Sequence, residues 1–311
     1  MNLIEAIKQQ PGTSFTREEI KHIAREHKIK TKETQAFLSN ANNRHQRGRY
    51  GVAITEAEPQ KVETDEEVST RIRDRFEVLT SLTVSSVSGE TRALIVSGPP
   101  GLGKTHTVTT TVETFCINGV VAKLSGSASA VGLYRALSDT RQKGSVLIID
   151  DCDTIFTDLI SLSLLKGACD STKKRMLRWT SEYHFGGDDI DREFEYSGTV
   201  IFITNIDFDL ELARKSRLTP HIDALMSRAH YLTLGIKTRR DYIIRIKDVI
   251  TEMYTRGEFA KEEAQDAVNF INRYAGNLRE LSCRTAIKLT QLRKSIPHDW
   301  ERIARITMCK E

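Results

Sequence analysis

The residue types and spacing that most clearly serve chemistry in this chain lie in one glycine-rich stretch. It reads Gly98-Pro-Pro-Gly-Leu-Gly-Lys-Thr105 and directly follows a short apolar run. Glycines let a backbone wrap closely around phosphates, loop N–H groups and a helix N-terminus attract their charge, lysine contacts the outer phosphates, and a threonine hydroxyl ligates Mg²⁺. The sequence therefore predicts an ATP and Mg²⁺ site, with Thr105 as a metal ligand, formed by Gly98, Pro99, Pro100, Gly101, Leu102, Gly103, Lys104 and Thr105.

A second apolar run ends in two carboxylates, in the segment Val146-Leu-Ile-Ile-Asp-Asp151. Carboxylate oxygens suit Mg²⁺, and a carboxylate beside the metal can orient and polarise the water that attacks a phosphate. We expect Asp150 to hold Mg²⁺ together with Thr105, and Asp151 to orient the water. Asp153 is an alternative for the second role, although a solvated loop carboxylate is the simpler interpretation of that residue.

These motifs resemble the Walker A and Walker B motifs of AAA+ P-loop ATPases. The resemblance covers roughly residues 65 to 295, and several segments look like bacteriophage-encoded members of the family. It implies an ATPase that converts ATP and water to ADP and phosphate. Relatives usually have glutamate where this chain has Asp151. Because aspartate is shorter, a switch that binds ATP and hydrolyses it poorly is an alternative.

The resemblance also implies a polar residue that helps to place the attacking water. The segment 199–205 resembles the sensor 1 strand of the family, and it ends in Thr204 and Asn205. Asn205 is the first candidate and Thr204 the second. An ordinary asparagine at a strand end is the simpler interpretation.

An arginine in the C-terminal part is implied to face the γ-phosphate. Gly276-Asn-Leu-Arg-Glu-Leu281 resembles sensor 2, and Asn277 with Glu280 could cap a helix that begins there. Arg279 would then lie in the first helical turn, where a positive charge is unfavourable unless an anion compensates it. A solvated arginine is the alternative.

A second arginine is implied to act on the neighbouring subunit. The segment 224–228 resembles the one that supplies the arginine finger, so Arg228 is the candidate and Arg217 its competitor. Either residue could instead form an ion pair within its own chain. A finger that acts across subunits implies a homo-oligomer, either a ring or a partial ring, with a hexamer as one option.

The elements that must position these residues follow from hydrophobic patterning. Short apolar runs alternate with helical stretches, as in a parallel α/β sheet; they are residues 92–97, 120–124, 145–149, 199–204 and 230–234. A helix is expected over residues 68–82. The predicted fold class is α/β, an AAA+ P-loop NTPase core whose parallel sheet is flanked by helices. The predicted domains are an N-terminal helix-turn-helix-like module at 1–53, a polar and acidic linker at 54–67, the core at 68–235 and a helical lid at 236–311.

The N-terminal module is the most basic part of the chain. Thr16-x-x-Glu19 is a capping box that opens the first of two short helices, and a hairpin-like segment, 44–51, follows them. This order resembles a winged helix-turn-helix, and a small helical adaptor is the alternative. Between residues 17 and 49, nine Lys and Arg oppose four Glu, a surplus of five charges, while the whole chain has a net charge of +4. Such a module suits recruitment to DNA through counterion release.

Two other segments bear on what the ATPase acts on. Residues 171–197 are expected to form a hairpin whose base has Lys173, Lys174, Arg175 and Arg178 beside Trp179, a set that could bind single strands or simply be solvated. The loop after residue 124 has no aromatic residue at its tip, which disfavours an enzyme that threads polypeptides. Ser125 could be a polar residue that couples the substrate to the water-orienting carboxylate.

We therefore expect ATP hydrolysis coupled to remodelling of DNA or a DNA–protein complex, as in replication, recombination or helicase loading. The alternative is a protein-remodelling ATPase that acts on a protein client. The five cysteines are widely spaced and form no CxxC pair, which disfavours disulfides and zinc sites. We therefore expect the protein to act in the reducing cytoplasm, which is that of the host cell if the protein is phage-encoded. No apolar run is long enough to span a membrane.

Overall fold

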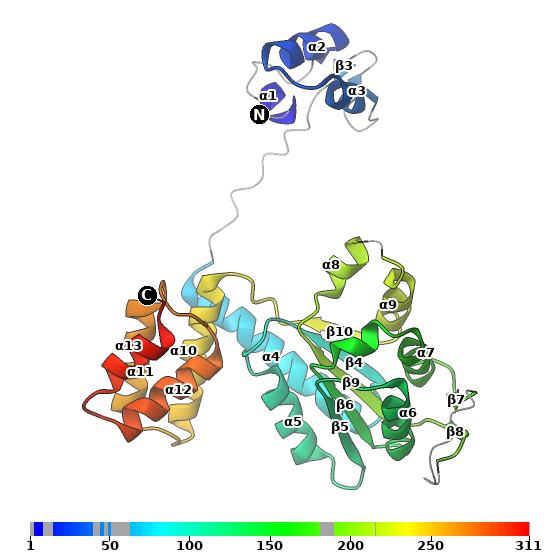
Figure 1. The fold of residues 1–311 in the computed structure, drawn as a ribbon, viewed down its shortest axis with the longest axis vertical. Helices are drawn as coiled ribbons and strands as arrows, with labels where there is room; N and C mark the ends of the chain where they lie inside the picture. Colours follow the sequence, from blue (N-terminus) through cyan, green and yellow to red (C-terminus); the bar gives the residue numbers. More distant parts are fainter. Residues whose placement is uncertain are drawn as a thin grey trace. The chain divides into compact units, whose positions relative to one another are not determined.

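The chain divides into two compact units, residues 1–62 and residues 63–311. The structure is a computed structural model (Figure 1). It describes residues 3–8, 15–39, 44–46, 49–50, 63–180, 190–214 and 216–310. Among the described residues, no helix is both long and apolar enough to cross a membrane.

The N-terminal unit combines three short helices with a small sheet of strand order β1-β3-β2. Its elements are α1 (Leu3–Lys8), β1 (Phe15–Thr16), α2 (Arg17–Glu26), α3 (Thr31–Ser39), β2 (Arg44–Gln46) and β3 (Arg49–Tyr50). Strands β2 and β3 pair antiparallel in the segment where the sequence predicted a hairpin, and β1 pairs with β3. This order of helices and strands is compatible with the winged-helix interpretation, which stays a prediction. The patterning did not predict α1 and β1, because both are too short to show a period.

The capping box at the start of α2 forms as predicted. The Thr16 N–H donates to Glu19 Oε2 at 2.6 Å, and the Glu19 N–H donates to Thr16 Oγ1 at 3.4 Å. Ile20, Ile23 and Ala24 then lie on the buried face of the helix. The helical spacing of these apolar residues therefore gives the unit its own core.

The larger unit is built on a parallel five-stranded sheet with the order β10-β4-β9-β6-β5. The strands are β4 (Ala93–Ser97), β5 (Val121–Ser125), β6 (Val146–Asp150), β9 (Thr199–Thr204) and β10 (His230–Thr233). Each lies within one residue of a predicted apolar run at either end. The predicted α/β class is therefore confirmed.

Helices cover both faces of this sheet (Figure 1). Residues that alternate along the strands point to opposite layers, as the strand period requires. Leu94 and Val96 of β4 pack with α4 (Asp65–Val87) and α5 (Lys104–Phe115), whereas Ile95 packs in the layer of α6 (Ala130–Asp139) and α7 (Leu159–Ala168). The central strands read as continuous apolar runs because both of their faces are buried.

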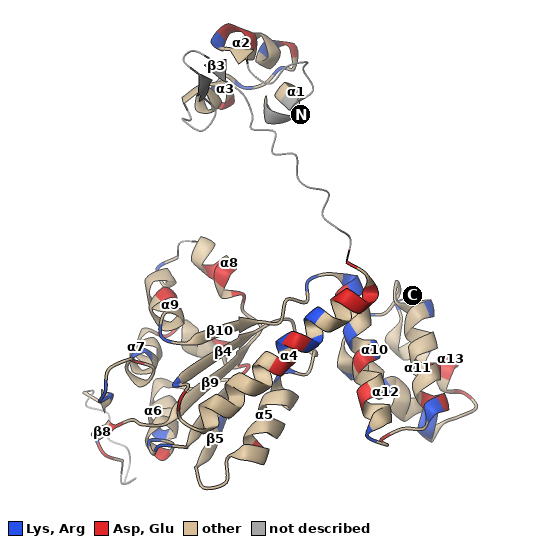
Figure 2. Ribbon diagram, turned by 180° about the vertical axis from the view of Figure 1, so that it is seen from behind, with Lys and Arg blue, Asp and Glu red and all other residues tan. Residues whose placement is uncertain are grey.

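Helix α4 is longer than predicted. It begins at Asp65, so the last residues of the predicted linker lie in its first turn. Thr64 caps it through a second capping box: its N–H donates to Glu67 Oε2 at 2.8 Å, and its Oγ1 accepts from the Glu67 N–H at 3.1 Å. The acidic run that looked like linker composition therefore stabilises a helix N-terminus. Figure 2 shows both signs of charge along the exposed side of α4.

The predicted hairpin exists as β7 (Met176–Arg178) and β8 (Glu193–Glu195), and residues 181–189 between these strands lie outside the described residues. Two of its predicted nucleic-acid residues are structural instead. Arg175 is buried, donates to Ala168 O at 2.6 Å and Gly198 O at 3.0 Å, and lies over the Tyr196 ring. Trp179 is also buried, with its ring 5.4 Å from that of Tyr134. The nucleic-acid interpretation of these two residues was wrong, because basic and aromatic residues can also alternate where a hairpin packs on a core.

The C-terminal part of the unit, predicted as the lid, is helical and has its own core. Its helices are α10 (Arg239–Thr255), α11 (Lys261–Tyr274), α12 (Cys283–Ser295) and α13 (Trp300–Met308). The prediction of a helix start at Asn277 was wrong. Helix α12 begins at Cys283, where Ser282 is the N-cap and accepts a hydrogen bond from the Thr285 N–H. The Ser282 side chain therefore pairs with one of the free backbone N–H groups in the first turn of α12.

Candidate functional site

The glycine-rich loop joins β4 to α5, as a phosphate-binding loop requires. Gly103 directly precedes the helix with φ = 98°, and Gly101 has φ = 73°. These left-handed conformations favour glycine. A Cβ on Gly101 would also lie 2.6 Å from the Cβ of Ser282 in the lid, so this position has no room for a side chain. The loop N–H groups and the N-terminus of α5 together form an anion-binding environment.

Lys104 is buried at the first position of α5. Its ammonium donates to Gly98 O at 2.6 Å, to Pro99 O at 2.9 Å and to Asn205 Oδ1 at 2.9 Å. Burial lowers the pKa of Lys104 to about 8, and the carboxylates of Asp151 and Asp150 oppose this shift. A bound phosphate would add negative charge beside this cation and further favour its protonated form.

Thr105 and Asp150 come together at the start of α5 and the end of β6. The Thr105 hydroxyl donates to Asp150 Oδ1 at 2.9 Å, and the Asp150 side chain is almost fully buried. A hydroxyl and a carboxylate are oxygen ligands of the kind that Mg²⁺ prefers, with phosphate oxygens and waters to complete its shell. The chemistry of these residues fits the predicted metal site.

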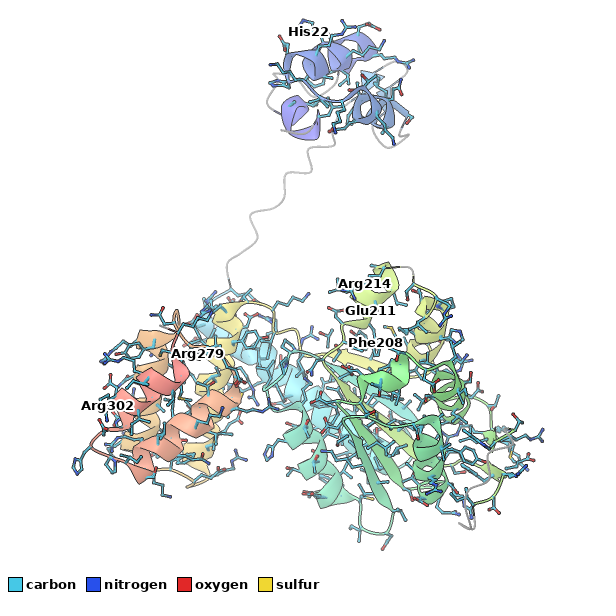
Figure 3. All side chains as sticks on the ribbon, viewed as in Figure 1. His22, Phe208, Glu211, Arg214, Arg279 and Arg302 are labelled. Carbon is cyan, nitrogen blue, oxygen red and sulfur yellow. The ribbon has the colours of Figure 1, made fainter. Side chains whose placement is uncertain are left out.

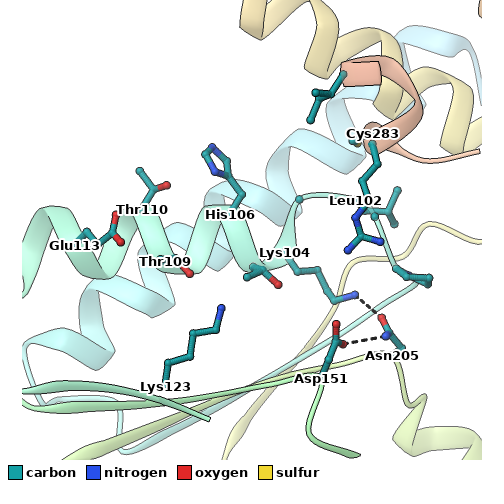
Figure 4. Close-up of a pocket in the computed structure, with 16 residues that line it drawn as sticks. Leu102, Lys104, His106, Thr109, Thr110, Glu113, Lys123, Asp151, Asn205 and Cys283 are labelled. Atoms are coloured by element: carbon teal, nitrogen blue, oxygen red, sulfur yellow. Dashed lines mark hydrogen bonds between the residues drawn. The ribbon is translucent and has the colours of Figure 1, made fainter. Parts of the chain in front are cut away.

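Asp151 follows β6 in an unusual backbone conformation. Its φ is 50°, which is uncommon for a residue with a side chain, and its N–H donates to Ile203 O at 3.0 Å. Its carboxylate accepts a hydrogen bond from Asn205 Nδ2 at 3.0 Å (Figure 4). Asn205 therefore bridges Lys104 and Asp151 by accepting from one and donating to the other, which the amide group can do and a carboxylate cannot.

The alternatives to Asp151 and Asn205 lie elsewhere. Thr204 is buried and donates to Asp153 Oδ1 at 2.7 Å, so these two side chains satisfy each other. Asn205 lines the cavity at the glycine-rich loop, and neither Thr204 nor Asp153 does. The geometry therefore favours Asn205 and Asp151 for the water-positioning roles.

The cavity beside the loop measures about 640 Å³, within the usual size of small-molecule sites. Lys104, Asp151 and Asn205 line it (Figure 4), as does Thr105 of α5, and Arg284 of α12 lines it from the lid. A cavity between two parts of one unit, with cations and hydrogen-bond donors around it, suits a polyanionic ligand.

Arg279 does not line this cavity, although the sequence placed it at the γ-phosphate. It precedes α12, and its Nε donates to Cys309 O at 2.9 Å, which ties the loop to the C-terminal segment of the lid (Figure 3). The side chain lines a neighbouring cavity on the other side of Pro100. Arg279 lies before α12 and not in its first turn, because this helix begins at Cys283, later than the motif implied.

The two candidate arginine fingers differ in their surroundings. Arg228 is half-buried, and its guanidinium donates to Asp170 Oδ2 at 3.3 Å and to Ala224 O at 2.5 Å. Arg217 is exposed between α8 (Phe208–Ala213) and α9 (Thr219–Met226). The intrachain ion pair that the sequence allowed for Arg228 is therefore present.

The sequence did not predict two cations, Arg284 and Lys123, that line the cavity beside the glycine-rich loop, called the main cavity below. The signal for Arg284 was Ser282, a capping residue two positions before it and ahead of an apolar helical pattern. The signal for Lys123 was a lone charge inside the apolar strand β5. Both signals are local, and neither residue belongs to one of the family motifs.

Comparison with known proteins gives one family and one relative. Residues 94–224 match the model of the ATPase family associated with various cellular activities (AAA). An uncharacterised 36.7 kDa protein from the nrdC–mobD intergenic region of Enterobacteria phage T4 is 37% identical over 259 residues, which are 82% of this chain and 78% of that protein.

Solved structures resemble the chain more distantly. A mutant form of Thermotoga maritima RuvB is 16% identical with a TM-score of 0.44, over 79% of this chain and 70% of that chain. NtrX from Brucella abortus in complex with ATP is 11% identical with a TM-score of 0.42, over 78% and 49%.

The positions of Arg279 and Arg284 lead to opposite expectations for two variants. Arg284→Ala should weaken nucleotide binding about tenfold, the typical loss for one charge-assisted hydrogen bond. Arg279→Ala should leave affinity within about twofold and lower the melting temperature of the lid, because it removes only the bond to Cys309 O. Titration with a fluorescent ADP analogue, beside thermal unfolding, measures both. Normal affinity in Arg284→Ala together with weak binding in Arg279→Ala would return the role to Arg279.

Proposed function

Because the chain belongs to the AAA+ family of P-loop ATPases, we propose that it couples ATP hydrolysis to the remodelling of DNA or of a DNA–protein complex. Replication, recombination and helicase loading are tasks of this type. The observation that carries the DNA part is the charge arrangement of the N-terminal unit. The bacteriophage relative supports action in the cytoplasm of an infected host cell.

The acidic residues of helices α2 and α3 each have a partner within the N-terminal unit. Glu18 pairs with Lys21 at 2.9 Å, and Glu19 accepts from the Thr16 N–H. Glu33 Oε1 accepts from the Leu3 N–H at 2.8 Å, and Glu26 lies 3.7 Å from His22 Nδ1. The carboxylates are therefore engaged locally, and most lie on α2, whose mixed charges are visible in Figure 2.

The lysines that lead into α3 are different. Lys28, Lys30 and Lys32 are all exposed, and none forms an ion pair with another described residue. They lie in and after the turn that joins α2 to α3, the second helix of the helix-turn-helix. In such motifs the second helix enters the major groove, where flanking lysines meet phosphates and release counterions. This charge separation supports duplex DNA as the partner.

The ATPase site of the proposal uses the residues that the cavity brings together. Lys104 and the loop backbone would hold the phosphates, and Thr105 and Asp150 would hold Mg²⁺. Mg²⁺ would neutralise charge on the phosphates, while Asp151, held by Asn205, would orient the attacking water. Because aspartate is shorter than the glutamate of relatives, slow hydrolysis of bound ATP is the alternative outcome.

Arg228 would complete the site of a neighbouring subunit in a ring or partial ring. Its pair with Asp170 is long and partly exposed, so exchanging that partner for a phosphate costs little. Arg217 is the second candidate for the same role because it is exposed. Both candidates would place each active site at a subunit interface.

Steady-state ATP hydrolysis with single- and double-stranded DNA across a salt series tests the DNA proposal. Duplex DNA should stimulate turnover, and the effect should fade as salt rises because binding rests on phosphate contacts. The variant Lys30→Glu with Lys32→Glu should keep its DNA-free rate, bind duplex DNA at least about tenfold more weakly, and reduce the salt slope by about one per lysine.

The matched control is Lys143→Glu with Lys261→Glu, which makes the same charge change at exposed lysines of the ATPase unit. It should bind DNA like the wild type. Equal losses in both variants would mean that only net charge matters. Turnover that no DNA changes would reject the DNA proposal and favour the protein client.

Mixing experiments test the arginine finger. Arg228→Ala should bind ATP normally and lose most of its hydrolysis, since removal of such an arginine costs on the order of 10³-fold in rate. Mixing it with Lys104→Ala, which should bind no ATP, should restore part of the activity by pairing an intact site with an intact finger. Lack of rescue at every ratio, with rescue for Arg217→Ala instead, would transfer the role to Arg217.

A further inference from the structure

Lys123 is a charged residue within an otherwise uncharged strand. It lies in the middle of β5, Val-Ala-Lys-Leu-Ser, at the edge of the sheet next to β6. Its side chain is 40% exposed, and it extends from the strand into the main cavity towards α5 (Figure 4). An edge strand tolerates a charge on its open side, but this charge points to the active site instead.

The ammonium of Lys123 contacts the carboxylate that is predicted to hold Mg²⁺. Its Nζ is 2.8 Å from Asp150 Oδ2, while Asp150 Oδ1 accepts the hydrogen bond from the Thr105 hydroxyl at 2.9 Å. Both oxygens of this buried carboxylate are therefore engaged. The Asp150 side chain is almost fully buried and that of Lys123 is 40% exposed, so this pair is less solvated than an ion pair on the open surface.

A lysine in this position would affect a bound metal in two ways. It takes up one oxygen of the carboxylate that would hold Mg²⁺, and Mg²⁺ demands strict geometry from its oxygen ligands. It would also place a positive charge beside the site of a divalent cation. Both effects would weaken the binding of Mg²⁺, and both depend on the same contact between Lys123 and Asp150.

We propose that Lys123 is a tethered cation that competes with Mg²⁺ for Asp150 and thereby sets the concentration of free Mg²⁺ at which the nucleotide site fills. The proposal rests on the assignment of Asp150 to the metal site under the proposed function. Lys123 is a positioning residue here, because it acts through Asp150. In the metal-free protein it neutralises a carboxylate that lies close to Asp151, and Mg²⁺ takes over that task when it binds.

The test is a titration of the full-length protein with MgCl₂ at constant ionic strength, with a fluorescent ADP analogue as the probe. Lys123→Met removes the charge and keeps much of the side-chain length, and it should lower the half-saturating Mg²⁺ concentration about tenfold. Lys123→Arg keeps the charge and should stay near the wild type. Lys143→Met, at an exposed lysine outside the cavity, is the matched control and should not differ from the wild type.

Thermal unfolding separates competition from a purely structural ion pair. In EDTA, Lys123→Met should melt below the wild type, because Asp150 loses its cation; with MgCl₂ and ADP the difference should vanish, because the metal replaces the lysine. A structural pair predicts a lower melting temperature in both conditions and no change in the Mg²⁺ requirement.

An unchanged or higher Mg²⁺ requirement in Lys123→Met would overturn the proposal. Lys104→Ala serves to verify that the probe reports on the glycine-rich loop, since it should bind no probe. If the wild type itself bound the nucleotide without any response to Mg²⁺, the metal site of the proposed function would fall together with this inference. If the wild type responded to Mg²⁺ and Lys123→Met showed neither a lower Mg²⁺ requirement nor the melting difference in EDTA, this inference would be rejected and the metal site would stand.

Discussion

The amide of Asn205 connects the two charged groups on which the site depends. It accepts from the Lys104 ammonium and donates to the Asp151 carboxylate, both within 3.0 Å. The contact is possible because β4, β9 and β6 are adjacent and parallel, so their carboxyl ends meet at one edge of the sheet. The glycine-rich loop, Asn205 and Asp151 each directly follow one of these strands. The order of strands therefore assembles the site, and the two packed layers of helices hold that order in place.

The lid is joined to this arrangement through backbone. The Cys283 N–H, at the start of α12, donates to Gly101 O at 2.7 Å, and the lack of a side chain on Gly101 lets Ser282 approach. A phosphate that moves the loop must therefore move the lid or break this bond. Arg245 of α10 adds a separate contact between the lid and the rest of the unit, because its guanidinium lies 4.0 Å from the centroid of the Phe76 ring of α4.

The sequence predicted the parts of this molecule whose signals are local and strong. Apolar runs predicted the strands, because both faces of a central parallel strand are buried, and the glycine pattern predicted the loop after β4. Prediction from the sequence failed where one pattern is compatible with two interpretations. Arg175 and Trp179 alternate like a nucleic-acid site but pack on the core, and the motif around Arg279 implied a helix start that Ser282 provides later. Lys123 could not be paired with Asp150, since no sequence pattern states which side chains meet across two neighbouring strands.

The most direct test of the account is single-turnover hydrolysis of bound ATP by Asn205→Leu, which has nearly the same volume and cannot hydrogen bond. ATP should still bind, because the loop and Lys104 remain, and the rate of hydrolysis should fall by about 10²-fold or more, as when a positioning hydrogen bond is lost. Asn205→Gln, which keeps the amide, should retain part of the rate. Hydrolysis at the wild-type rate in Asn205→Leu would contradict the account, because Asp151 would then orient the water without the bridge to Lys104.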